Sequence, residues 1–177
     1  MINLMVDIET TGLDPNKNAI IQIGALPFDL NIMAKGSKAF KMSLTIPSDR
    51  EWMPSTKEWW LKTNPDLLKD ITSKSENFIV VMSRFREYVK SFNDEIRFWS
   101  NHPFDWNFLN NYFVSYGVPR PYKYDAFRDL DTYIVAIVGE NNIKKYKPIP
   151  KEELEHDALY DCMLQIDWLF ESIKNKG

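Results

Sequence analysis

The pattern of apolar and polar positions along the 177-residue chain predicts three strands near its start. Residues 2–6 are mostly branched and apolar, and a second, largely apolar run covers 19–30. Residues 38–45 alternate between apolar and polar side chains, which is the period of a half-buried strand. Because short connections join these runs, we expect three antiparallel neighbours in one sheet.

Helical periodicity dominates the remainder of the chain, with two shorter strands between the helices. Strands are predicted at 96–99 and 122–124, and the Lys-rich, Pro-interrupted segment 139–150 is predicted to be a mobile loop. Helices are predicted over 58–61, 66–71, 77–92, from Asp105 to near Gly117, over 131–138 and in a last helix opened by 156–161. We therefore expect one α/β domain over 1–177. Its mixed sheet should have three antiparallel strands, then parallel ones, and be flanked by helices.

Composition narrows the class of protein without naming an activity. Hydrophobic residues at 44% and charged residues at 27% are ordinary for a soluble globular protein. No apolar run reaches membrane-spanning length and the start is not basic, so we expect a cytoplasmic protein without membrane contact. The single cysteine, Cys162, excludes an intramolecular disulfide framework and a cysteine-based zinc site. The net charge of −3 does not exclude nucleic acid, because bound divalent ions invert the field of an acidic site.

The segment Asp7-Ile8-Glu9-Thr10-Thr11-Gly12, at the end of the first apolar run, carries candidate chemistry. Side chains at i and i+2 of a strand point to the same side, so Asp7 and Glu9 should project together. Two carboxylates that close repel each other unless a cation lies between them, and oxygen ligands suit Mg²⁺ or Mn²⁺. An Asp-x-Glu is common by chance in an acidic chain, so the segment alone also fits an ordinary surface strand.

Two later segments change that balance. Residues 100–109 place Asp105 at the start of an apolar helix, and residues 156–161 open the last helix. With the first segment and in this order, they resemble the three motifs of the DEDD superfamily of 3′→5′ exonucleases, His subtype, which has a ribonuclease H-like fold. Further stretches at 54–60, 128–132 and 156–162 are similar to the branch that contains phage exodeoxyribonuclease A and exoribonuclease-like domains of bacteria and prophages.

The resemblance implies two-metal phosphodiester hydrolysis with Mg²⁺ or Mn²⁺, two ions per site. It assigns the metal-binding acids to Asp7, Glu9, Asp105 and Asp161, and the general base to His156. The sister subtype has a Tyr four residues before the last Asp, where this chain has Asp157, so the His subtype is the one matched. Since residues five apart lie about 140° round a helix, His156 should lie at or before the helix start.

The expected reaction is the stepwise release of 5′-mononucleotides from the 3′ end of single-stranded or 3′-overhang nucleic acid, with DNA slightly favoured over RNA. The 11 Phe, 8 Tyr and 6 Trp suit stacking on unpaired bases. Trp59 and Trp60 are adjacent, so at most one can face the site. The residues expected to contact substrate are Thr10, Thr11, Gly12, Leu13, Asn101 and Phe104.

Several acids and polar residues near the motifs have simpler interpretations. We expect Asp157 to be a helix cap, Asp131 to be the N-cap of the helix that follows it, and Asp129 to be structural. His102 is expected in a loop and Cys162 in the core.

Two other functions fit part of the pattern. A ribonuclease H-type endonuclease shares the fold and the metals but has a different motif order and no His before the last Asp. It would cut closed circles, whereas an exonuclease needs an end. A catalytically silent nucleic-acid-binding or polymerase-associated module is the second alternative, and the five intact catalytic positions argue against it. The sequence does not decide whether the protein forms a homodimer, whether a partner protein positions it, or whether its substrate is DNA or RNA.

Overall fold

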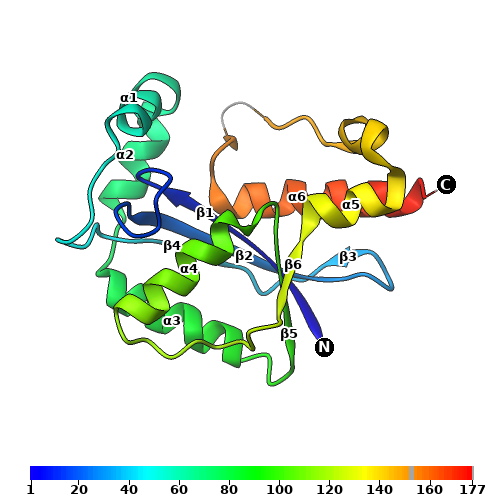
Figure 1. Cartoon of the computed structure of the whole chain (residues 1–177), viewed down its shortest axis with the longest axis horizontal. Coiled ribbons are helices and arrows are strands. Elements are labelled where there is room, and N and C mark those ends of the chain that lie inside the picture. The colour runs from blue at the N-terminus through cyan, green and yellow to red at the C-terminus, as the bar shows by residue number, and fades with distance from the viewer. Residues whose placement is uncertain (152–153, 177) are drawn as a thin grey trace.

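Strand β1 (Ile2–Thr10) lies in the middle of a six-stranded mixed sheet in the computed structural model, which describes residues 1–151 and 154–176 (Figure 1). The sheet has the order β3-β2-β1-β5-β6, and β4 pairs with β2. β1 is antiparallel to β2 and parallel to β5, and β5 is parallel to β6. The remaining strands are β2 (Ile20–Asp29), β3 (Ala34–Lys35), β4 (Phe40–Ser43), β5 (Ile96–Ser100) and β6 (Phe127–Asp129).

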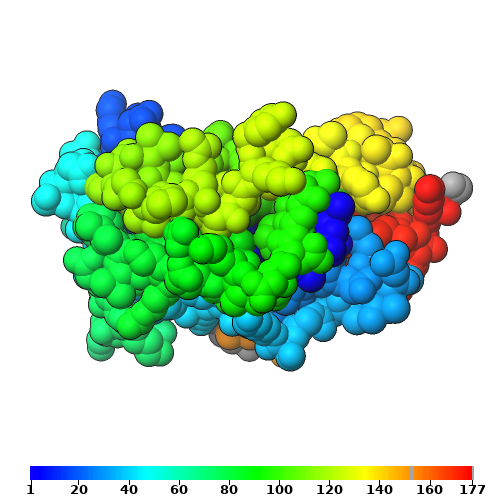
Figure 2. Space-filling model, turned by 90° about the horizontal axis from the view of Figure 1, so that it is seen from below, coloured from blue at the N-terminus to red at the C-terminus, as the bar shows by residue number. Residues whose placement is uncertain are grey.

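Helices cover both faces of this sheet. The described helices are α1 (Pro54–Thr63), α2 (Pro65–Ser73), α3 (Phe78–Lys90), α4 (Pro103–Ser115), α5 (Leu130–Val138), the 3₁₀ helix η1 (Glu140–Tyr146) and α6 (Ala158–Lys174). In Figure 1, α3 and α4 lie below the sheet and α5 and α6 above it. Seen from below, the green atoms of α3 and α4 cover much of that face (Figure 2). None of the described helices is both long and apolar enough to cross a membrane.

The strict alternation of β1 gives each face its own core. Leu4, Val6 and Ile8 belong to the buried cluster shared with α3 and α4. Met5, one residue out of phase, belongs to the cluster shared with α5 and α6. Because successive side chains of a strand point to opposite faces, β1 directs its odd-numbered residues toward α6.

A close approach of backbones fixes the start of α6 against β2. A Cβ added at Gly24 would lie 2.3 Å from the backbone carbonyl carbon of Ala158, so only glycine permits this contact. The buried Gln22 side chain accepts a hydrogen bond from the Ala158 amide at 2.9 Å. The Lys41 ammonium pairs with Asp157, whose carboxylate caps the helix through the Tyr160 amide. The first turn of α6 is thereby held over the sheet.

The structure confirms the three antiparallel strands and corrects three details of the predicted elements. The short strand predicted at 122–124 is wrong: the pairing with β5 is made by β6, and Tyr122 instead packs its ring against Trp106 at 4.7 Å. The N-cap of α5 is Asp129, whose carboxylate accepts from the Thr132 amide at 2.7 Å, and not Asp131. The segment 139–150, predicted to be a loop, contains the 3₁₀ helix η1. The prediction that Asp157 caps a helix is confirmed.

Candidate active site

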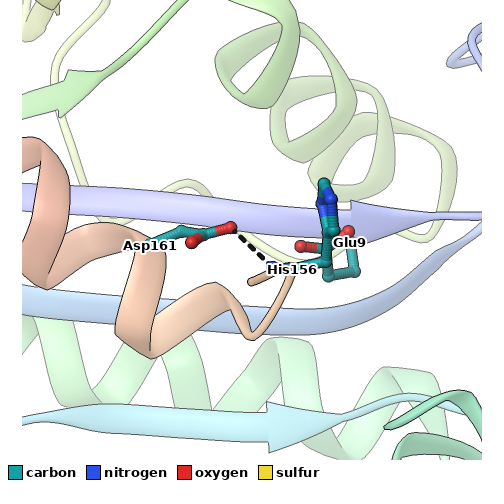
Figure 3. A group of neighbouring side chains, drawn as sticks. All are labelled: Glu9, His156 and Asp161. Carbon is teal, nitrogen blue, oxygen red and sulfur yellow. Dashed lines mark hydrogen bonds between the residues drawn. The ribbon is translucent and has the colours of Figure 1, made fainter. Parts of the chain in front are cut away.

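The alternation of β1 places Asp7 and Glu9 on the side that faces α6. Asp7 and Glu9 follow Met5 at every second position of β1, and Met5 belongs to the apolar cluster shared with α6. Glu9 lies close to the start of α6, and Figure 3 shows its side chain beside His156. The carboxylate and imidazole atoms of Glu9, His156 and Asp161 that could bind a metal all lie within 4.8 Å of one another. This cluster is the centre of the candidate site.

Asp105 reaches the same region from the opposite side of β1. Pro103 occupies the first turn of α4, which suits its fixed φ, and Asp105 follows in that turn. Its Oδ1 accepts a hydrogen bond from the Ile8 amide at 3.0 Å. The β5 pairing with β1 ends opposite Met5, so this amide is available to the carboxylate. Asp105 is only 6% exposed, and this hydrogen bond ties it directly to β1, which carries Asp7 and Glu9.

His156 and Asp161 are brought together by a turn that precedes α6. His156 has a φ of 69°, a left-handed conformation that is rare for a residue with a side chain. Its backbone amide donates to Asp161 Oδ2 at 3.2 Å, which is the dashed contact in Figure 3. The two residues therefore share one site, although five residues of regular helix would set them about 140° apart.

Burial raises the pKa of all four acids, and repulsion from the other acids adds to the rise for Asp7 and Glu9. Burial, and after it repulsion from Asp105 and Asp161, holds the pKa of Asp7 well above its usual range. Burial and repulsion from Asp7 do the same to the pKa of Glu9. Burial raises the pKa of Asp105 to about 7 and that of Asp161 to about 6.

The donor set fits a divalent metal. No lysine or arginine within 1–151 and 154–176 forms an ion pair with any of the four acids, whereas other surface acids do pair. Buried carboxylates without a counter-charge are costly unless they are protonated or bound to a cation. Carboxylate oxygens with one imidazole suit Mg²⁺, Mn²⁺ or Zn²⁺.

Two tryptophans of α1 surround the His156 ring. The Trp59 ring lies edge-on to it with centroids 4.7 Å apart, and Trp60 is at 6.2 Å. Trp60 is buried and donates from Nε1 to the Thr10 carbonyl at 3.4 Å, whereas Trp59 is partly exposed. Partial burial lowers the pKa of His156, so its imidazole is neutral at neutral pH. Of the two tryptophans, Trp59 is the one that presents an open surface beside the site.

Thr11 and Gly12, in the turn after β1, are buried by packing. Thr11 is fully buried: its hydroxyl donates to the Glu51 carbonyl at 2.8 Å and accepts from the Ala19 amide at 2.7 Å. A Cβ at Gly12 would lie 2.4 Å from Asn18 Oδ1, so glycine is required there by packing. Thr11 and Gly12 therefore shape the turn and do not line either of the two pockets beside the acids.

The other predicted substrate residues lie in two separate pockets. One, of about 360 Å³, is lined by Glu9, Thr10, Leu13, Trp59 and Phe104, with Leu13 67% exposed. The second lies on the Asp7 and Asp161 side of the acid cluster. Asn101 lines this second pocket and not the first, so the structure does not bring it together with Leu13 and Phe104.

Gln165 is a site residue that the sequence argument missed. Its Nε2 donates to Asp7 Oδ1 at 2.7 Å, and this hydrogen bond partly offsets the rise in the pKa of Asp7. Because a carboxylate only accepts, the amide nitrogen must face Asp7, which leaves the buried Oε1 pointing elsewhere without a partner among the described residues. Gln165 follows Asp161 by four residues on one helix face, and that spacing could have indicated it.

The chain is similar to known nucleases over most of its length. The family model described as "3'-5' exoribonuclease Rv2179c-like domain" matches residues 2–173. The chain is 25% identical over 175 residues to the 3'-5' DNA exonuclease Cap18 of Escherichia coli, covering 94% of this chain and 88% of Cap18.

Solved structures share the fold. Cell-death related nuclease 4 (CRN-4) has a TM-score of 0.67 at 16% identity, covering 98% of this chain and 64% of that one. The zinc-bound complex of E. coli exonuclease I with single-stranded DNA has a TM-score of 0.65 at 19% identity, covering 93% and 38%. The chain thus spans less than two thirds of either structure.

The fold and the family match together place the chain in the DEDD superfamily of 3′→5′ exonucleases, which confirms the resemblance and the ribonuclease H-like mixed sheet. Within it, the chain belongs to the 3'-5' exoribonuclease Rv2179c-like domain family.

Without metal, the protein should lose stability as the pH rises from about 4 to about 7. The pKa of Asp105 is about 7 in the folded protein, against about 3.9 for an exposed Asp, so in this window the folded state holds a proton that the unfolded state has released. The free energy of unfolding should therefore fall across the window. Urea unfolding in EDTA at pH 5 and pH 7.5 measures it. Asp105→Asn should flatten the change and exposed Asp66→Asn should not; equal slopes in all three proteins would contradict the assignment.

Replacement of Gln165 by Met should remove the hydrogen bond to Asp7 while preserving side-chain length. Loss of the donor raises the pKa of Asp7 further, so the acid limb of the pH–rate profile should move to higher pH. Mn²⁺ affinity measured by calorimetry at pH 7 should fall roughly 10–100-fold, the usual effect of losing a group that orients a ligand. An unchanged acid limb with unchanged Mn²⁺ affinity would show that Gln165 only fills space.

Proposed function

We propose that this protein is a metal-dependent 3′→5′ exonuclease that removes 5′-mononucleotides one at a time from single-stranded or 3′-overhang nucleic acid. The observation that carries the proposal is the meeting of four carboxylates and a histidine around β1, where no described lysine or arginine forms an ion pair with any of the four acids. All five side chains come from one chain, so the site does not need a second copy or a partner protein to complete it.

The metal requirement follows from the acid cluster. Asp7, Glu9, Asp105 and Asp161 would hold two divalent ions, Mg²⁺ or Mn²⁺. When bound, such a pair activates water for attack on phosphorus and neutralises charge on the departing 3′-oxygen. The zinc-bound state named for E. coli exonuclease I supports a divalent ion in this fold.

His156 would be the general base. Its burial against Trp59 lowers its pKa, so the neutral ring can accept the proton of the attacking water at neutral pH. The left-handed turn at His156 holds the ring beside Asp161 and outside the regular helix. Trp59 limits the ring to a few orientations.

The pocket beside Glu9 would hold the terminal nucleotide. The Leu13 and Phe104 side chains and the Trp59 ring supply apolar surface on which a base can stack. The exposed Leu13 stands where a strand would have to continue past the site. This arrangement favours cleavage at a free 3′ end over the endonuclease alternative.

DNA is the substrate we favour, with RNA as a second candidate. Cap18, which aligns over most of both chains, is named as a DNA exonuclease, and exonuclease I is named in complex with single-stranded DNA. The family description names an exoribonuclease.

Digestion of 5′-labelled DNA and RNA oligomers of one sequence, with Mg²⁺ and with Mn²⁺, tests the polarity and the preference. We expect a ladder that shortens from the 3′ end, release of 5′-mononucleotides, and faster loss of DNA. A 3′-phosphate should stop the reaction, and Asp7→Asn should abolish it. Cleavage of circular or 3′-blocked strands as fast as free ends would exclude an exonuclease.

His156→Ala should lower the rate by roughly 10²–10⁴-fold, the usual contribution of a positioned general base. Mn²⁺ affinity should stay nearly unchanged, and the limb of the pH–rate profile that belongs to His156 should disappear. His102→Ala, at the other histidine of the chain, is the matched control and should retain the parent rate. Collapse of Mn²⁺ affinity in His156→Ala would instead make His156 a ligand.

A further inference from the structure

A second pocket, of about 260 Å³, lies on the side of the acid cluster away from the terminal-nucleotide pocket. Asp7, Asp161 and Gln165 form one wall. Lys147, Pro148 and Pro150 form another, and they belong to the segment 140–151, which runs back along α6 toward its start (Figure 1). The volume is below the roughly 300–1,000 Å³ of pockets that enclose a whole ligand, so it suits a short length of a polymer.

Lys147 is the cation of this pocket. Its ammonium lies 5.3 Å from the centroid of the Trp168 ring, over the face of a buried indole. Trp168 Nε1 donates to the Ile143 carbonyl at 3.0 Å, which ties η1 to α6 and fixes the position of the segment. Lys147 forms no ion pair with any carboxylate of the described residues, although Glu155 also lines the pocket.

A lysine opposite an acid cluster that binds metals is suited to an anion held between them. A phosphodiester fits, because each phosphate carries one negative charge and the strand contains a phosphate at every step. The direction of the strand follows from the two pockets. With the 3′-terminal nucleotide beside Glu9, Trp59 and Leu13, the rest of the strand must leave on the Asp7 side.

We propose that Lys147 binds a backbone phosphate of the substrate strand upstream of the scissile bond, in the pocket between α6 and the segment 140–151. This inference rests on the proposed exonuclease function and adds a binding position to it. Lys147 acts mainly on affinity for the strand, although its charge also lowers the pKa of Asp161, as the smallest of the influences on that group. A strand with an upstream phosphate therefore benefits far more from Lys147 than a substrate without one.

The test compares Lys147→Gln with Lys145→Gln. Lys145 lies in the same segment, with its ammonium 5.2 Å from the Tyr146 ring centroid, and it does not line the pocket. The substrates are a single-stranded DNA oligomer and thymidine 5′-(p-nitrophenyl phosphate), which has a terminal nucleotide and a cleavable phosphate but no upstream phosphate. Binding of a labelled oligomer in EDTA, followed by fluorescence anisotropy over a range of salt, gives a readout without turnover.

Lys147→Gln should lower kcat/KM for the oligomer about tenfold, as expected for loss of one charge-assisted contact, and lower hydrolysis of the small substrate far less. The salt dependence of binding should become shallower by about 0.7 in log–log slope, the value for one phosphate of a single strand. Lys147→Arg should recover most of the loss, and Lys145→Gln should match the parent protein in every assay.

Equal losses on both substrates would overturn the proposal, because Lys147 would then act at the metal site. Equal losses in Lys147→Gln and Lys145→Gln would overturn it too, because only general charge would matter. If the parent protein hydrolysed neither substrate, the proposed function would fail. The slope measured in EDTA would still decide whether Lys147 contacts a phosphate.

Discussion

The burial of four neighbouring carboxylates, none of which forms an ion pair with a described lysine or arginine, is the constraint on which the site depends. Burial raises the pKa of each acid, and repulsion raises those of Asp7 and Glu9 further. A loose scaffold would relieve the strain by letting them move apart. The fold prevents this by fixing the acids on three rigid elements, so that a divalent cation becomes the favourable way to neutralise them. Asp7 and Glu9 are on β1, Asp105 is on α4 and Asp161 is on α6.

The attachments are specific hydrogen bonds and one close backbone contact. Asp105 is held by the Ile8 amide, and Asp7 by the Gln165 amide nitrogen. Asp161 depends on the position of α6, which approaches β2 closely because Gly24 has no side chain. Each contact joins residues far apart in the chain, except the bond from the His156 amide to Asp161. The site is therefore a product of the sheet topology and not of any local segment.

The sequence predicted the parts of the site that depend on local periodicity. The alternation of β1 placed Asp7 and Glu9 on one side, and the spacing from His156 to Asp161 required a turn before the helix. It did not predict that Asn101 would line a different pocket from Phe104, because that depends on how the start of α4 meets β1 and α6. It also missed Gln165: its spacing of four residues from Asp161 was the available signal, but its partner Asp7 lies 158 residues away in the chain.

The strand predicted at 122–124 shows the same limit. Tyr122 is a good strand former, yet its ring is more favourably packed against Trp106 and Phe98 than exposed on a strand. The strand forms at β6 instead, where Phe127–Asp129 can pair with β5 and Asp129 can cap α5 immediately afterwards. Propensity alone could not decide this, because both outcomes depend on contacts with α4 and β5.

The two sides of the acid cluster differ in chemistry, and this difference gives the site a direction. On the Glu9 side, Trp59, Leu13 and Phe104 offer apolar surface suited to one base. On the Asp7 side, Lys147 offers a positive charge. The acids alone do not distinguish these two sides, because both pockets border the same cluster. The difference comes from α1 and the turn after β1 on one side, and from the segment 140–151 on the other.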